Sequence, residues 1–147
     1  MPAVRTYDAV VKRKLRRKRR SACPLNAAVE ALGDRWSLLV VRDMMFGARN
    51  FADLSKTHEG IATNILAARL RRLAAEDIVA VAPDPQDRRK RIYRLTAKGI
   101  ALAPVMAEMV LWAAAHEQTG RQELVHALKT DKEGFLAGIR ANWEKIS

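Results

Sequence analysis

The sequence contains a single cysteine among its 147 residues, so no disulfide bond can form within one chain. It also lacks a Gly-rich phosphate-binding loop and a nucleophile elbow, which mark nucleotide-dependent enzymes and α/β hydrolases. Its three histidines, His58, His116 and His126, are scattered, and none has a cysteine at the spacing of a metal site. We therefore expect no enzyme, no metal and no cofactor.

Long apolar runs are also scarce. The first twenty residues lack the apolar core of a secretory signal peptide, so we do not expect secretion. The segment 99–115 has one charged residue, Glu108, and raises the question of a membrane span. A span needs about 20 apolar residues, and this shorter segment contains Pro104, so we expect a soluble helix and no membrane partner. The lone cysteine likewise favours the cytoplasm.

Acidic residues are few relative to basic ones. Lys and Arg number 27 against 16 Asp and Glu, which gives a formal net charge of +11. Residues 1–20 hold nine basic residues and one acid, while the remaining 127 residues hold 18 and 15. A short block of like charge repels itself and is typical of a flexible arm that becomes ordered on a polyanion. We predict such an arm over 1–20, with a nucleic acid as its partner.

The stretch 51–95 organises the rest of the chain. Asn50 is a favourable N-cap for a short helix that begins at Phe51. Gly60 can adopt the positive φ that a tight turn requires, and a second helix follows it. Two short helices joined by a tight turn are the first half of a DNA-binding motif.

The second helix is predicted over 62–75, because Leu66, Leu70 and Leu73 recur at helical spacing. These leucines form its buried face. The opposite surface would then face base edges, and the residues that we expect to read DNA are Thr63, Asn64, Ala67 and Arg71.

A β-hairpin is predicted after this helix, with strands over 78–82 and 91–95. Asp84 and Asp87 fall in the connection, where we interpret them as turn residues and not as an acid–base pair. The order of helix, turn, helix and basic hairpin predicts a winged helix-turn-helix, mainly α with a small β-hairpin. The wing residues expected to contact DNA are Arg88, Arg89 and Arg91.

A compact helix is predicted over 24–32, because Pro24 suits its first position and Gly33 suits the position after its end. This places Cys23 at the N-cap. A helix N-terminus and a nearby basic run both favour the thiolate of a reactive cysteine. A lone cysteine can equally be an inert small hydrophobic residue, and both alternatives stay open.

Further helices are expected on both sides of the reading unit. Asp34 can cap a largely apolar, buried helix over 35–46. Thr96 can cap a long helix that runs towards Glu117, kinked or broken at Pro104. Two short amphipathic helices, over 121–129 and 131–146, complete the chain. We expect these flanking N- and C-terminal helices to hold two subunits together.

The order of several motifs resembles the HxlR family of bacterial transcriptional regulators, which is related to the MarR-like class. The resemblance covers about residues 22–116 and implies a homodimer that binds a two-fold DNA site. In some members an N-terminal cysteine senses electrophiles or oxidants, which makes Cys23 a candidate sensor. The motifs that carry the resemblance are Cys23-Pro24, Gly33-Asp34-Arg35-Trp36-Ser37-Leu38-Leu39, Gly47-Ala48-Arg49-Asn50-Phe51, Gly60-Ile61, Tyr93-Arg94-Leu95-Thr96, Gly99 and Trp112.

The sequence departs from this family at the start of the recognition helix. Ala62 stands where the family usually has Ser, so we expect Thr63 to cap the helix. Ala67 stands where the family often has Thr, so readout would rely more on contacts with thymine methyl groups.

The sequence therefore predicts a flexible arm over 1–20, a winged helix-turn-helix domain over 21–118 and a helical extension over 119–147. We expect a cytoplasmic, homodimeric regulator of transcription, a repressor, that binds double-stranded DNA and responds to an electrophile, an oxidant or another small molecule. Arg49 is expected to clamp a phosphate. Two alternatives are a protein-interaction module with the same fold and a non-specific nucleic-acid binder that relies on the arm.

Overall fold

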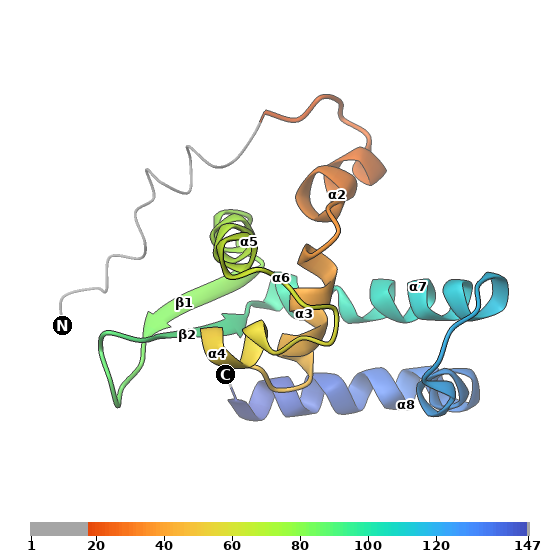
Figure 1. Cartoon of the computed structure of the whole chain (residues 1–147). Helices are drawn as coiled ribbons and strands as arrows, with labels where there is room; N and C mark the ends of the chain where they lie inside the picture. Colours follow the sequence, from red (N-terminus) through yellow and green to blue (C-terminus); the bar gives the residue numbers. More distant parts are fainter. Residues whose placement is uncertain (1–17, 147) are drawn as a thin grey trace. The chain divides into compact units, whose positions relative to one another are not determined.

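The computed structural model describes residues 18–146, so most of the expected basic arm lies outside the described residues. The chain divides into two compact units, one up to Gly99 and the other from Ile100 onwards. The first unit contains the helices, the turn and the hairpin that the sequence predicts (Figure 1). Its elements are α2 (Pro24–Leu32), α3 (Ser37–Met45), α4 (Phe51–Ser55), α5 (Thr63–Ala75), β1 (Val79–Pro83) and β2 (Arg91–Leu95).

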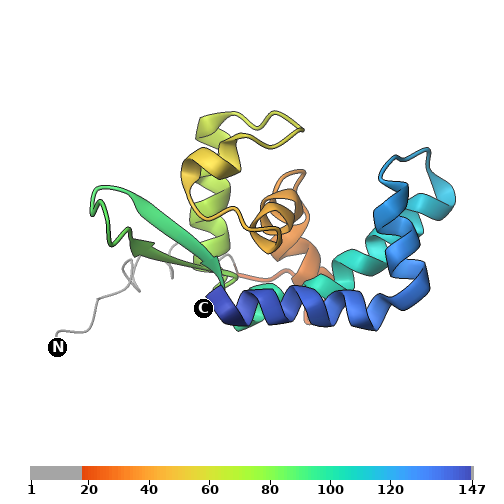
Figure 2. The same ribbon diagram turned by 90° about the horizontal axis from the view of Figure 1, so that it is seen from below.

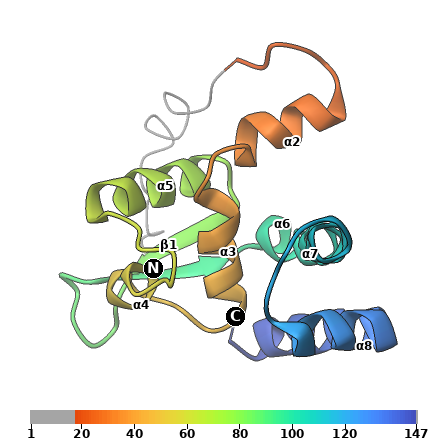
Figure 3. The same ribbon diagram turned by 45° about the vertical axis from the view of Figure 1, so that its right-hand side comes forward.

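The helix-turn-helix is formed by α4 and α5. The side chain of Asn50 caps α4 by accepting a hydrogen bond from the backbone N–H of Asp53 at 2.9 Å, as predicted. Gly60 has φ +69 in the turn, which confirms the need for glycine there. Figure 3 shows α5 lying across one side of the hairpin, with α4 nearby.

The two strands pair antiparallel, with Val79 opposite Leu95 and Pro83 opposite Arg91. The hairpin also pairs with the residues just before α4. Asn50 forms an isolated antiparallel bridge with Ile92, and the N–H of Tyr93 donates to the carbonyl oxygen of Arg49 at 2.7 Å. The tip of the hairpin projects away from the helices of this unit (Figure 2). The wing is therefore held at its base and exposed at its tip.

The core of the first unit lies where α3, α4, α5 and the hairpin meet. The predicted leucine face of α5 is confirmed, since Leu66, Leu70 and Leu73 are all buried. Burial of a leucine side chain stabilises a fold by about 1.5–3 kcal/mol. The core is completed by Val40, Val41, Leu54, Ile61, Ile78, Val79 and Leu95.

The start of α3 corrects the prediction by two residues, because the helix begins at Ser37 and not at Arg35. Asp34 acts as a cap for the turn that precedes the helix. Its Oδ1 accepts from the N–H groups of Trp36 and Ser37 at 2.8 and 2.9 Å, and its Oδ2 accepts from the Ser37 hydroxyl. The carboxylate therefore satisfies backbone donors that the first helical turn cannot satisfy itself.

The helix expected from Thr96 towards Glu117 is in fact two helices, α6 (Ala97–Ile100) and α7 (Ala103–His116). Thr96 caps only the first, where its Oγ1 accepts from the N–H of Gly99 at 3.1 Å. Pro104 lies in the first turn of α7, as suits a residue that lacks an N–H donor. The break that was expected near Pro104 is confirmed, and it lies just before that residue.

The second unit consists of α7 and α8 (Gln122–Ile146), which pack against each other. Asp131 has φ −151 and ψ 79 inside α8, so the element is two helical segments joined at a kink, close to the two short helices predicted. Lys132 forms an ion pair with Glu108 of α7. Figure 2 shows the change of direction within α8.

One helical stretch in the described residues, 97–116, is long and apolar enough to span a membrane by length and composition alone. The break at Ala101 and Leu102 interrupts it. The 14 residues of α7 then extend over about 21 Å, which is less than the roughly 30 Å of a bilayer's hydrocarbon core.

Candidate nucleic-acid interface

The recognition helix α5 presents its predicted reading residues to solvent. Thr63, Asn64 and Arg71 are exposed, and Ala67 is partly buried. The helix N-cap is Ala62, and no side chain caps it, so the expectation that Thr63 would do so is wrong. Because Thr63 is the first helical residue, its hydroxyl is not used as a cap. The N-terminal N–H groups of α5 and its dipole are then well suited to meet a phosphate.

The wing carries an exposed basic tip. Arg88, Arg89, Lys90 and Arg91 are all exposed. Asp84 and Asp87 shape the connection, since their carboxylates accept from the N–H groups of Gln86 at 2.8 Å and Arg89 at 3.1 Å. This confirms them as turn residues.

Two of the wing arginines make local contacts. The Nε of Arg89 lies 3.1 Å from Asp87, and these hydrogen bonds hold the pKa of the Asp87 carboxyl below its ordinary value. Arg91 donates to the backbone carbonyl of Arg88 at 3.2 Å. The guanidinium groups therefore lie at the tip in orientations set by the turn.

Arg49 differs from the wing residues. It is partly buried, and its carbonyl oxygen accepts a hydrogen bond from the N–H of Tyr93 in β2. The residue thus links the start of α4 to the wing, and its expected role as a phosphate clamp stays a prediction.

Two further cationic residues of the hairpin were not among the predicted contacts. Lys90 lies within the basic run, and Arg94 is exposed on β2, on the opposite face of the strand from Tyr93. The alternation of side chains along the strand could have identified Arg94. The turn of the motif adds exposed Lys56 and His58, which line a shallow hollow of about 510 Å³.

Cys23 occupies the N-cap of α2, as predicted, and it is exposed. Its side chain makes no capping hydrogen bond, while its carbonyl oxygen accepts from the N–H of Ala27 at 3.0 Å. Arg20, three residues before it, pairs with Glu30 at 3.0 Å. The thiol is therefore accessible at the end of a helix.

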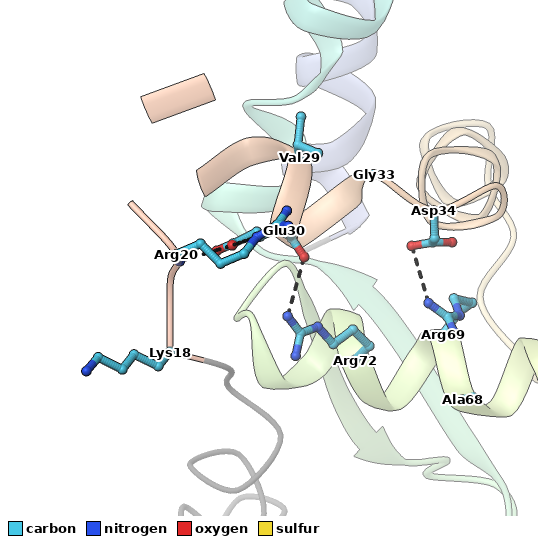
Figure 4. A pocket seen from close by; sticks show the side chains of 10 residues that line it. Lys18, Arg20, Val29, Glu30, Gly33, Asp34, Ala68, Arg69 and Arg72 are labelled. Atoms are coloured by element: carbon cyan, nitrogen blue, oxygen red, sulfur yellow. Dashed lines mark hydrogen bonds and ion pairs between the residues drawn. The ribbon is translucent and has the colours of Figure 1, made fainter. Parts of the chain in front are cut away.

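A cavity of about 840 Å³ lies between α2 and α5 (Figure 4). Its lining contains more cationic than anionic side chains, and Arg69 and Arg72 come from the recognition helix itself. Arg72 pairs with Glu76 at 3.0 Å, whereas Arg69 lies 3.4 Å from Asp34. The charged residues of the lining are Lys18, Arg20, Glu30, Asp34, Arg69 and Arg72.

Within the part of the chain that the structure describes, no three or more His, Cys, Asp or Glu side chains gather in a group that could hold a metal ion.

The match to a family model explains this combination of elements. The model of the HxlR-like helix-turn-helix matches residues 31–121, which is well over half of the chain. The chain belongs to the HxlR-like family. The chain is thus a transcriptional regulator with a helix-turn-helix, and its α3, α4, α5 and hairpin lie within the matched residues. The match ends before α8, so the second helix of the C-terminal unit lies beyond it.

Relatives of this HxlR-like chain include the HTH-type transcriptional regulator YodB of Bacillus subtilis (strain 168). The two are 38% identical over 92 residues, which cover 62% of this chain and 82% of YodB. The structure of reduced YodB matches with a TM-score of 0.57 and 35% identity, over 68% of this chain and 99% of that one. Diamide-treated and quinone-bound forms of YodB have also been solved.

Two other solved structures have the same fold. PA1607, a candidate transcription factor, matches with a TM-score of 0.64 and 34% identity, over 70% of this chain and 71% of that one. The redox regulator HypR in its oxidised form matches with a TM-score of 0.54 and 26% identity, over 66% of this chain and 100% of that one. The fold class predicted from the sequence, a winged helix-turn-helix, is confirmed.

Proposed function

We propose that this HxlR-family regulator is a cytoplasmic repressor that binds a two-fold DNA operator as a homodimer. The observation that carries the proposal is that two exposed groups suited to DNA lie on one unit. The exposed residues Thr63, Asn64 and Arg71 lie on α5, and the cationic tip of the wing projects from the same unit. One group suits the bases of a major groove, and the other suits the adjacent backbone or minor groove.

The homodimer is supported by apolar side chains that remain exposed. On α7, Val105, Met109 and Trp112 follow helical spacing and are 51%, 50% and 62% exposed. A stripe of this kind on one helix is self-complementary when two copies meet about a two-fold axis. Two recognition helices would then bind major grooves about 34–36 Å apart, so the operator would carry two-fold symmetry.

A response to oxidants or electrophiles is supported by Cys23. The thiol is exposed at the N-terminus of α2, where a reagent in solution can reach it. YodB, to which this chain is similar, has been solved in diamide-treated and quinone-bound forms, and HypR is a redox regulator. We propose the same class of response here, with Cys23 as the sensing residue and the basic arm over 1–20 as a contact to the DNA backbone.

The test is to mix the purified full-length protein with fragmented genomic DNA and to sequence the fragments that it retains at moderate salt. We expect one short motif with two-fold symmetry, bound at least 10³-fold more tightly than random DNA of equal length. Retention without a shared motif would instead indicate a non-specific binder. No retention at all would favour the protein-interaction module.

A further inference from the structure

The cavity between α2 and α5 contains a guanidinium group whose hydrogen-bonding capacity is not used up. The Nε of Arg69 is buried and has no hydrogen-bond partner among the described residues. Its nearest carboxylate, Asp34, lies 3.4 Å from its Nη1, which is longer than a good charge-assisted hydrogen bond. A buried N–H without a partner costs about 1–3 kcal/mol in desolvation. Because this Nε is covered by protein, a ligand in the cavity would meet the Nη groups of Arg69, and the buried Oε2 of Glu30 in the same lining also lacks a partner among the described residues.

Asp34 is already used as a cap for the start of α3. Burial disfavours its charged form, but the hydrogen bonds from Ser37 and Trp36 outweigh burial and hold its pKa below the ordinary value. Its two oxygens already accept from the backbone of Trp36 and from both the backbone and hydroxyl of Ser37. The carboxylate thus accepts three hydrogen bonds from the start of α3 and makes only a longer contact, of 3.4 Å, with Arg69.

The other walls of the cavity suit an organic molecule. Val29 and Ala31 come from α2, and Ala68 comes from α5, one residue before Arg69. The volume of about 840 Å³ lies in the range of small-molecule sites. Four cationic and two anionic side chains line the cavity, and Glu76 pairs with Arg72, so a net charge of about +1 remains to attract an anion.

From these contacts we infer that the cavity binds a small organic carboxylate. The Nη groups of Arg69, whose side chain is 32% exposed, would receive the carboxylate, since guanidinium and carboxylate match in a bidentate geometry. The apolar body would lie against Val29, Ala31 and Ala68. The arginine would thus bind the charged end of the ligand, and the apolar side chains would contact the rest of it.

The same helix connects this cavity to the DNA-reading face. Ala68, Arg69 and Arg72 line the cavity, whereas Asn64 and Arg71 are exposed on the neighbouring surface of α5. A ligand held between α2 and α5 would change DNA affinity if it binds the free and the DNA-bound forms with different affinity, and by reciprocity DNA would change the affinity for the ligand. This regulatory step rests on the proposed function, while binding of the carboxylate does not.

Binding is tested first, without DNA. Isothermal titration of the full-length protein uses sodium benzoate and sodium phenylacetate, with benzamide and phenylacetamide as neutral analogues of the same shape and sodium phosphate as an inorganic anion. We expect saturable binding of at least one acid, with a Kd of about 0.1–10 mM for a ligand of roughly ten non-hydrogen atoms. The amides and phosphate should bind at least tenfold more weakly.

Variants then locate the site. Arg69→Gln should weaken binding of the acid at least tenfold, and Arg69→Lys, which keeps the charge but loses the fork, should weaken it severalfold. Arg35→Gln removes one exposed arginine outside the cavity and should leave the affinity unchanged. Ala68→Leu fills the apolar wall without changing charge and should likewise weaken binding at least tenfold. It keeps the test decisive if Arg69→Gln does not fold, as judged by circular dichroism.

The inference is overturned if no acid binds below about 10 mM, if phosphate binds as well as the acids, or if Arg35→Gln weakens binding as much as Arg69→Gln. It is also overturned if Arg69→Gln flattens the salt dependence of DNA binding by about 0.9 in slope, because Arg69 would then contact a DNA phosphate. The acid that binds is finally added to the complex with the selected operator, where a change in DNA affinity is expected. If no operator exists, the proposed function fails, but the titration still shows whether the cavity binds an organic acid.

Discussion

The guanidinium of Arg42 on α3 holds the carboxylate of Glu59 in the helix-turn-helix turn, with its Nη1 and Nη2 at 2.7 and 2.9 Å from the two oxygens. Glu59 also accepts from the hydroxyl of Thr57 at 2.6 Å. The next residue is Gly60, whose positive φ directs the chain into α5. The bidentate pair therefore fixes the turn to the central helix, and with it the start of the recognition helix.

This pair predicts a defined loss of stability in acid. The Arg42 hydrogen bonds, and then that of Thr57, lower the pKa of Glu59 to about 2. A lowered folded-state pKa stabilises the protein above the unfolded value of about 4.3, and this contribution is lost as pH falls towards 2. Because Glu59 is about one-third exposed, we expect its contribution to be about 1 kcal/mol after solvent screening.

The measurement is the Tm of the wild type and of Glu59→Gln at pH 6 and at pH 3. At pH 6 the Tm of Glu59→Gln should be several degrees below that of the wild type. At pH 3 the difference between the two Tm values should be smaller, because Glu59 is then partly protonated in the wild type. Glu117→Gln, an exposed glutamate at the C-terminal end of α7, serves as the control and should not lower the Tm at pH 6, because the helix dipole does not favour a carboxylate there. An equal loss at both pH values would mean that the ion pair is not what the substitution removes.

Base readout is predicted to depend on Asn64. An amide can form a bidentate contact with adenine, so Asn64→Ala should weaken operator binding by about 1–3 kcal/mol and random-DNA binding by much less. Fluorescence anisotropy with both DNAs provides the comparison. Asn142→Ala, an exposed asparagine in the second half of α8, is the matched control. Equal weakening on both DNAs would limit Asn64 to a contact with the backbone.

The wing is predicted to contribute charge without sequence preference. Each phosphate contact that is lost should flatten the plot of log affinity against log salt by about 0.9. The double variant Arg88→Gln, Arg91→Gln should therefore reduce the slope by about 1–2 while the operator-to-random ratio stays within severalfold. An unchanged slope would show that the tip points away from DNA.

Assembly is predicted to depend on the exposed stripe of α7. Trp112→Glu places a charge where a second copy would pack, so light scattering at micromolar concentration should show a monomer in place of a dimer. Gln118→Glu adds the same charge at an exposed position beyond the helix end and should leave the dimer intact. A wild-type protein that is already monomeric would contradict the assembly itself.

The sensing role predicts a single site of modification. Cys23 should react with a quinone or with diamide faster than a free thiol near neutral pH, and modification should weaken operator binding. Cys23→Ser should remove the response and keep basal binding within about twofold. A non-reducing gel distinguishes an intersubunit disulfide from a mixed adduct. A reaction rate no greater than that of a free thiol would leave Cys23 as a structural residue.

Much of the fold could be predicted because its signals are local. The spacing of Leu66, Leu70 and Leu73 predicted the buried face of α5, and the positions of Asn50 and Gly60 predicted the cap and the turn. The two strands shifted by no more than one residue from the prediction. The predictions were wrong at two helix starts. The start of α3 was placed two residues too early, and Thr63 was expected to cap α5 but is its first helical residue.

Some features of the candidate site could likewise be predicted from local sequence, and others could not. The exposure of Thr63, Asn64 and Arg71 follows from helical periodicity, and the basic tip follows from a run of adjacent residues. The sequence by itself thus determined the family, the two helices of the motif and the charge of the wing. Only the tertiary structure decided that Arg42 meets Glu59, 17 residues away, and that Arg69 faces a cavity beside α2. Such contacts depend on how elements distant in sequence pack together, and periodicity within one element contains no information about the side chains of another.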